Sequence, residues 1–100
     1  MMRYGGTTRL RPREVLARAR DYFQGEVGLD LSDESRLHIR FVGGGGWVTV
    51  TVRGTGQGTA LTMEVGEFDR EAQEFLASLP PPANRLRRFW GSWRRRERER

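Results

Sequence analysis

Apolar residues follow two different spacings along the first 79 positions, and these spacings predict helices and strands. Between Pro12 and Gln24 they recur at i, i+1, i+4, i+7 and i+8, which places them on one helix face: Val15, Leu16, Ala19, Tyr22 and Phe23. Pro12 suits the first turn of this helix, where its missing N–H is not needed, and Gly25 suits its end.

Three later segments alternate between apolar and polar residues, which is the period of a half-buried strand. They span residues 36–42, 47–53 and 59–65, and their inward positions are expected to be Leu37, Ile39, Phe41, Val48, Val50, Val52, Leu61, Met63 and Val65. The two connections, residues 43–46 and 54–58, are short and rich in glycine, as hairpin turns require. The pattern therefore predicts an antiparallel meander with one buried face.

A second helix is expected to begin at Asp69, a favourable N-cap residue, and to end before Pro80. Its apolar face consists of Ala72, Phe75, Leu76 and Leu79. Residues 26–35 are expected to form a loop, and residues 1–11 an N-terminal arm. The predicted fold class is α+β in the order α-β-β-β-α, with two helices packed on one face of a three-stranded meander over residues 12–79.

This order of elements resembles that of the double-stranded-RNA-binding domain, across residues 12–79. In that family RNA is held by the first helix, by the loop between the first two strands and by a lysine-rich start of the second helix. Here the second helix starts with the acidic run Asp69-Arg70-Glu71, and the loop is four glycines. Because phosphate binding requires positive charge at these places, RNA binding does not follow from the resemblance.

Charge divides the chain in two. All 18 basic residues are arginine, and the formal net charge is +5. Residues 1–82 hold 10 arginines and 11 acids, whereas residues 83–100 hold 8 arginines and 2 acids. Three prolines, Pro80 to Pro82, stand between the two parts and favour an extended spacer. We therefore expect a near-neutral domain followed by a proline spacer and a strongly basic tail.

The tail, residues 83–100, has the pattern of a basic amphipathic helix. Its apolar stripe would be Leu86, Phe89, Trp90 and Trp93, and its candidate binding arginines are Arg85, Arg87, Arg88, Arg94, Arg95 and Arg96. Three uses stay open: docking on the protein's own body or on a second copy, association with an anionic membrane surface, and binding of nucleic acid.

The outer face of the predicted sheet is a second candidate surface. By strand parity it carries Arg36, His38, Arg40, Trp47 and Arg53. Arginine and tryptophan are residues that protein partners and single-stranded nucleic acids both use. An open sheet also encourages self-association, so a homodimer belongs among the expected states.

Catalytic and metal-binding chemistry has little support in the residues. The chain has no cysteine and one histidine, which argues against a disulfide scaffold, a thiol nucleophile or a zinc site. The acids Asp30, Asp33 and Glu34 lack the spacing of a calcium loop. Paired acids also occur at 64, 67, 69, 71 and 74, but those from Glu67 to Glu74 fall where a helix begins, a position that stabilises acids without any catalytic role. We expect no cofactor, no metal and no small-molecule substrate.

The sequence thus predicts a small, non-catalytic binding or assembly module that docks a protein partner or its own copy. A nucleic-acid-binding accessory protein and a module at a membrane surface are the alternatives, and a small enzyme with carboxylate chemistry is a third class. No secretory signal or membrane-spanning segment is recognisable, so a cytoplasmic location is expected.

Overall fold

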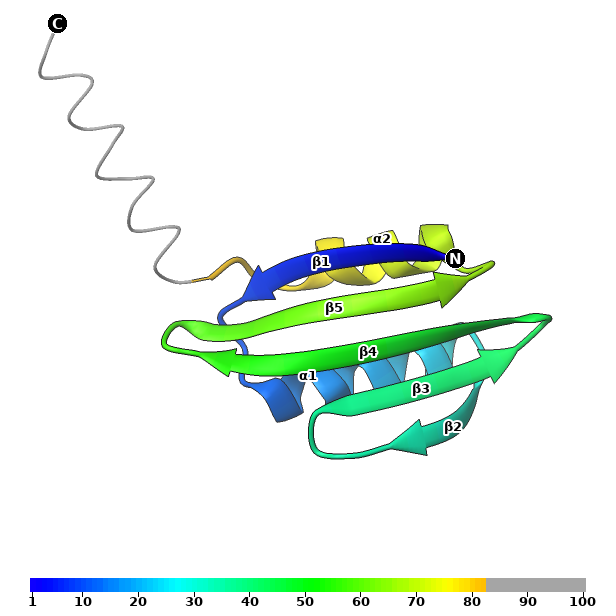
Figure 1. The fold of residues 1–100 in the computed structure, drawn as a ribbon, viewed down its shortest axis with the longest axis horizontal. Helices are drawn as coiled ribbons and strands as arrows, with labels where there is room; N and C mark the ends of the chain where they lie inside the picture. Colours follow the sequence, from blue (N-terminus) through cyan, green and yellow to red (C-terminus); the bar gives the residue numbers. More distant parts are fainter. Residues whose placement is uncertain (83–100) are drawn as a thin grey trace, which may run out of the picture.

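Five strands and two helical regions form the part of the chain that the structure, a computed structural model, describes, residues 1–82. The elements are β1 (Met2–Thr8), α1 (Pro12–Ala19), the π-helical segment η1 (Arg20–Glu26), β2 (Asp30–Glu34), β3 (His38–Gly43), β4 (Gly46–Thr55), β5 (Gly58–Gly66) and α2 (Asp69–Ser78). All strand pairs are antiparallel, and the strands lie in the order β1-β5-β4-β3-β2 (Figure 1).

The predicted three-stranded meander is therefore wrong, because the sheet has five strands. The alternating segments form β3, β4 and β5, and the glycine-rich connections between them are hairpins. The first additional strand, β1, lies within residues 1–11, where we expected an arm. The second, β2, lies within residues 26–35, where we expected a loop.

Neither additional strand carries a hydrophobic alternation of its own. The register of β1 on β5 runs from Met2 opposite Val65 to Thr8 opposite Thr59, and its inward positions are filled by Tyr4, Gly6 and Thr8. All five residues of β2 are exposed, and the strand is bulged between Leu31 and Asp33. A short, bulged, acidic strand is a common way to end a sheet without inviting further pairing. Strands of this composition can be identified from their pairing with neighbouring strands but not from their sequence pattern.

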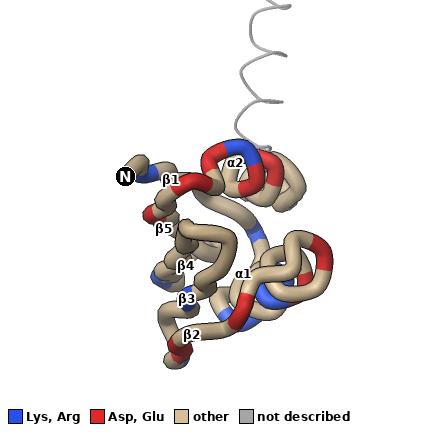
Figure 2. The backbone as a smooth tube through the Cα atoms, turned by 90° about the vertical axis from the view of Figure 1, so that its right-hand side faces the viewer, with Lys and Arg blue, Asp and Glu red and all other residues tan. Residues whose placement is uncertain are grey.

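The core lies between the sheet and the two helical regions, which cover the same face of the sheet (Figure 2). Its members come from both layers: Val15, Leu16, Ala19, Phe23, Leu29, Ile39, Phe41, Val48, Val50, Val52, Leu61, Met63, Val65, Ala72 and Phe75. Leu37 was expected among them but is 54% exposed, because it lies in the bend before β3 and outside the alternating register. The longest helical stretch within residues 1–82 is α1 followed directly by η1. No helix in this part of the chain is long and apolar enough to cross a membrane.

Both helix ends differ from the sequence expectation. The first helix continues past Gly25 as η1, and the glycine with positive φ that follows its end is Gly28 (φ 88°). In α2 the N-cap position belongs to Phe68, and Asp69 is the first helical residue. The Asp69 carboxylate instead accepts a hydrogen bond of 2.8 Å from the Tyr4 hydroxyl, so it joins α2 to β1.

Two buried threonines, each 1% exposed, hold the ends of these elements together. Thr8 donates a 2.6 Å hydrogen bond to the Pro80 carbonyl, and Thr59 donates one of 2.6 Å to the Leu10 carbonyl. These contacts join the end of β1, the start of β5 and the chain just after α2. They also fix the point from which residues 83–100 continue.

We predict that Gly58→Ala destabilises the protein by about 3 kcal/mol or more, because two penalties combine there. Gly58 has φ 138°, which strains an L-residue, and an added Cβ would approach the Arg9 Cα to 2.7 Å. The matched control is Gly56→Ala in the same hairpin, where an added Cβ meets nothing within 4 Å. Urea denaturation of both variants measures the difference. Equal stability of the two variants would contradict the placement of β1 against β5.

Candidate interaction surfaces

One row of side chains crosses the open face of the sheet. Antiparallel register aligns Arg3, Glu64, Thr49, Arg40 and Asp33 on five successive strands. Arg3 pairs with Glu64 at 2.6 Å, which compensates both charges. Within residues 1–82 no helix covers this face, so the row is accessible from solvent.

An arginine stacked on a tryptophan lies on this face beside the β3–β4 hairpin turn. The Trp47 indole lies over Gly66, where an added Cβ would come within 2.8 Å of the indole nitrogen. The Arg40 guanidinium carbon lies 4.9 Å from the indole centroid, and its Nη1 donates to the Thr49 hydroxyl at 3.3 Å. Stacking of this kind is worth about 0.5–1 kcal/mol at an exposed site. Arg40 is therefore held in place by two contacts.

The other predicted face residues are spread out. His38 is half-buried opposite Thr51, with its Nε2 3.7 Å from an Asp33 carboxylate oxygen. Arg53 is exposed near the other end of β4, opposite Ala60. Parity thus placed four of the five on strands of the open face, but the structure brings only Arg40 and Trp47 into contact among those four.

Arg36 departs from the expectation. It lies in the bend between β2 and β3 and lines a groove of about 450 Å³ against α1, rather than the open face. Arg13 and Arg20 line the same groove, and Leu37 contributes an exposed apolar wall. Glu34 pairs with Arg20, so this groove carries a net positive charge. Strand parity gave the wrong face for Arg36 because β3 begins only at His38, so Arg36 does not follow the strand alternation.

The tail residues named as candidates lie outside the described residues. They are Arg85, Leu86, Arg87, Arg88, Phe89, Trp90, Trp93, Arg94, Arg95 and Arg96. The prediction that they bind a partner therefore stays a prediction.

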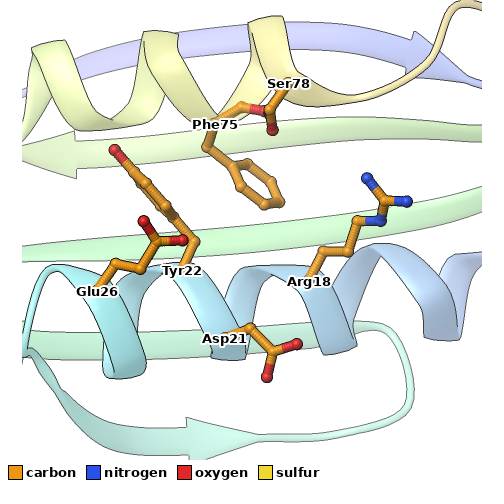
Figure 3. Close-up of a pocket in the computed structure, with 6 residues that line it drawn as sticks. All are labelled: Arg18, Asp21, Tyr22, Glu26, Phe75 and Ser78. Atoms are coloured by element: carbon orange, nitrogen blue, oxygen red, sulfur yellow. The ribbon is translucent and has the colours of Figure 1, made fainter.

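A second groove, of about 400 Å³, lies on the helical side of the molecule (Figure 3). Its lining comes from the α1–η1 helix and from α2: Arg18, Asp21, Tyr22, Glu26, Phe75 and Ser78. The Tyr22 and Phe75 rings stack with centroids 6.0 Å apart, and the Tyr22 hydroxyl donates to Glu74 at 3.0 Å. The floor of the groove is therefore aromatic and one of its rims is acidic.

The electrostatic character of this groove is visible in the titration of Tyr22. Burial, the hydrogen bond to Glu74 and the charges of Glu74, Glu71 and Glu26 together raise the pKa of Tyr22 to about 12. A phenol surrounded by carboxylates resists becoming a second anion. The same carboxylates would attract a cation placed beside the ring.

This groove was missed in the sequence. The helical spacing placed Tyr22 on the apolar face, and its neighbour Phe23 is fully buried as expected. A tyrosine on such a face usually keeps its hydroxyl at a polar partner, which was the available signal. The partner, Glu74, lies 52 positions away, so no local pattern could identify it.

Metal ligation finds no cluster to support it in the described part of the chain, where no three histidine or carboxylate side chains gather for an ion. Two of the three acids considered for calcium, Asp33 and Glu34, have other partners. Glu34 pairs with Arg20, and one Asp33 oxygen accepts the Glu34 N–H at 2.9 Å.

Comparison with known proteins finds no matching family, no similar curated protein and no similar solved structure. The function of the chain is therefore inferred from these surfaces.

We predict that Tyr22 ionises near pH 12 and that its titration lowers stability between about pH 10 and pH 12. In that window the folded chain keeps a proton that the unfolded chain has lost, so the free energy of unfolding falls as pH rises. Below the ordinary tyrosine pKa of 10.0 this contribution is fully present. Absorbance at the tyrosinate band and urea denaturation at several pH values measure the two effects.

Two variants assign this titration. Tyr22→Phe is expected to remove the late ionisation step, and Glu74→Gln to move it to lower pH, because it removes the nearest charge. A wild-type protein in which Tyr22 ionises at the ordinary value would contradict the acidic surroundings of the groove.

Proposed function

We propose that the protein is a non-catalytic binding module that docks an acidic surface of a protein partner on the open face of its sheet. The observation that carries the proposal is the Arg40 guanidinium stacked on Trp47 on that face. Arginine and tryptophan are the residue types that most often dominate binding energies at protein interfaces.

The geometry of this pair suits recognition of carboxylates. Stacking holds Arg40 without using all of its N–H donors, since one of them bonds Thr49. A guanidinium that is already positioned loses less side-chain entropy on binding and can offer two parallel hydrogen bonds to a carboxylate. Arg53 adds positive charge on the neighbouring strand β4, whereas Arg3 is compensated by Glu64.

The proposed module uses no cofactor, and the cytoplasmic location expected from the sequence stays a prediction.

Nucleic acid is the second candidate ligand of the same face. The indole of Trp47 and the guanidinium of Arg40 are groups on which unpaired bases stack. The two acidic residues of the row, Glu64 and Asp33, disfavour a phosphate backbone running along it. An acidic protein surface, which can place single carboxylates at Arg40, fits this arrangement better.

Site-specific photocrosslinking in the full chain tests the proposal. A photoreactive side chain at the exposed position 51 of β4 is expected to capture protein, and the same group at exposed Gln24 on the helical side is the control. Arg40→Glu should reduce capture at position 51 by roughly tenfold, the effect of losing one important interface residue. Capture equal to that at Gln24 would contradict the proposal.

A matched charge reversal separates specific from general electrostatic effects. Arg70→Glu makes the same charge change on α2, where the Arg70 side chain is 81% exposed, and should leave capture at position 51 unchanged. Nucleic acid instead of protein in the captured material, lost in Arg40→Glu, would replace the proposed partner by the second candidate. Equal losses in both variants would show that net charge alone governs the capture.

A further inference from the structure

The two ends of the groove between η1 and α2 are lined by different residues, and one end is acidic. Figure 1 shows α1 and α2 running in opposite directions, so the C-terminal end of α2 lies at the α1 end of the groove rather than at its η1 end. Arg18 and Ser78 lie toward one end, and Tyr22 and Glu26 toward the other (Figure 3).

Carboxylates outnumber cations around this groove. Asp21 and Glu26 line it beside Arg18, and Glu74 joins them through its hydrogen bond with Tyr22. Glu71 is close enough to act on the Tyr22 phenol as well. An occupant of this groove should therefore be cationic, and the stacked rings on its floor favour an occupant that is also aromatic.

The chain itself supplies such a segment next to the groove. Ser78 lines the groove, and residue 83 follows five positions later. Residues 83–100 contain eight arginines, two acids, Phe89, Trp90 and Trp93. The starting point of this segment is fixed, because the Pro80 carbonyl accepts the hydrogen bond from buried Thr8.

Length places no obstacle. Eighteen residues can span up to about 60 Å when extended. The groove extends along the helix from Arg18 to Glu26, which is about 12 Å at the rise of a helix. A segment tethered so close acts at an effective concentration on the order of millimolar, so individually weak arginine–carboxylate contacts suffice to hold it.

The two basic surfaces described above are unsuited to the same segment. The groove beside α1 is lined by Arg13, Arg20 and Arg36 with one carboxylate, Glu34. The open sheet face presents Arg40. Positive charge at both places repels an arginine-rich segment, whereas the groove between η1 and α2 attracts it.

We propose that residues 83–100 dock in the groove between η1 and α2 of the same molecule, with arginines on the carboxylates of its rim and aromatic side chains beside Tyr22. This docking site uses neither Arg40 nor Trp47, so it goes beyond the proposed function and leaves the open sheet face accessible.

Tryptophan fluorescence of the full chain tests the docking. In a Trp47→Phe background the remaining tryptophans are Trp90 and Trp93, both in the segment. Quenching by the neutral probe acrylamide is expected to be weaker than in the urea-denatured chain. The double variant E26R/E74R is expected to weaken docking by about tenfold or more, as like charges replace opposite ones, and to raise the quenching constant toward the denatured value.

A matched double variant controls for net charge. D30R/D33R makes the same charge change on the edge strand β2 and should leave the quenching constant unchanged. Circular dichroism checks folding, and E26Q/E74Q, which removes the groove charges without reversing them, decides the outcome if E26R/E74R does not fold. Molar salt is expected to release the segment in part, since it screens exposed charges.

Three results would overturn the proposal. The first is full accessibility of Trp90 and Trp93 in the native chain. The second is identical quenching in all the charge variants. The third is protection that disappears on dilution together with a change in molecular mass, which would assign the segment to a second copy. None of these results bears on capture at the sheet face, so the two proposals fail separately.

Discussion

The arrangement of the molecule depends on two buried threonine hydroxyls. Thr8 and Thr59 lie opposite each other at one end of the β1–β5 pair, and each donates to a backbone carbonyl, Pro80 and Leu10 respectively. A buried hydroxyl without a partner costs about 1–3 kcal/mol, so these bonds strongly favour one alignment of the segments they join. With β1 held there, Tyr4 reaches Asp69 and connects the edge strand to α2.

Segregation of charge follows from this arrangement. The described residues are nearly neutral in sum. The open sheet face nevertheless presents a stacked arginine, whereas the groove between η1 and α2 is surrounded mainly by carboxylates. Acids that help to start α2 are favourable near the helix N-terminus in any case. Glu71, one of these acids, has a second effect that it shares with Glu74 in the next turn, because both raise the pKa of the Tyr22 phenol and attract cations to the same place.

A strand that buries one face shows an alternation of apolar and polar residues in the sequence. A strand that is stabilised mainly by its neighbours lacks this pattern. Ile39 and Phe41, or Val48 and Val50, show the alternation of β3 and β4 directly. In β1 the inward positions hold a glycine and a threonine, which become interior only because β5 and Pro80 lie against them. In β2 no side chain is buried, so the strand exists through its pairing with β3 alone. The fold class was wrong for this reason.

The same distinction applies to the candidate surfaces. Arg40 and Trp47 lie seven residues apart on one hairpin, so parity and a short turn are enough to place both on one face. Tyr22 and Glu74 meet only after α2 has crossed back over the sheet, and Arg36 leaves the face because the strand starts two residues after it. A basic tail and a basic sheet face look additive in the sequence. In the folded chain the acidic groove lies near the point where the tail begins, since Ser78 lines it, so the proposed attraction toward the body would compete with any external ligand of the tail.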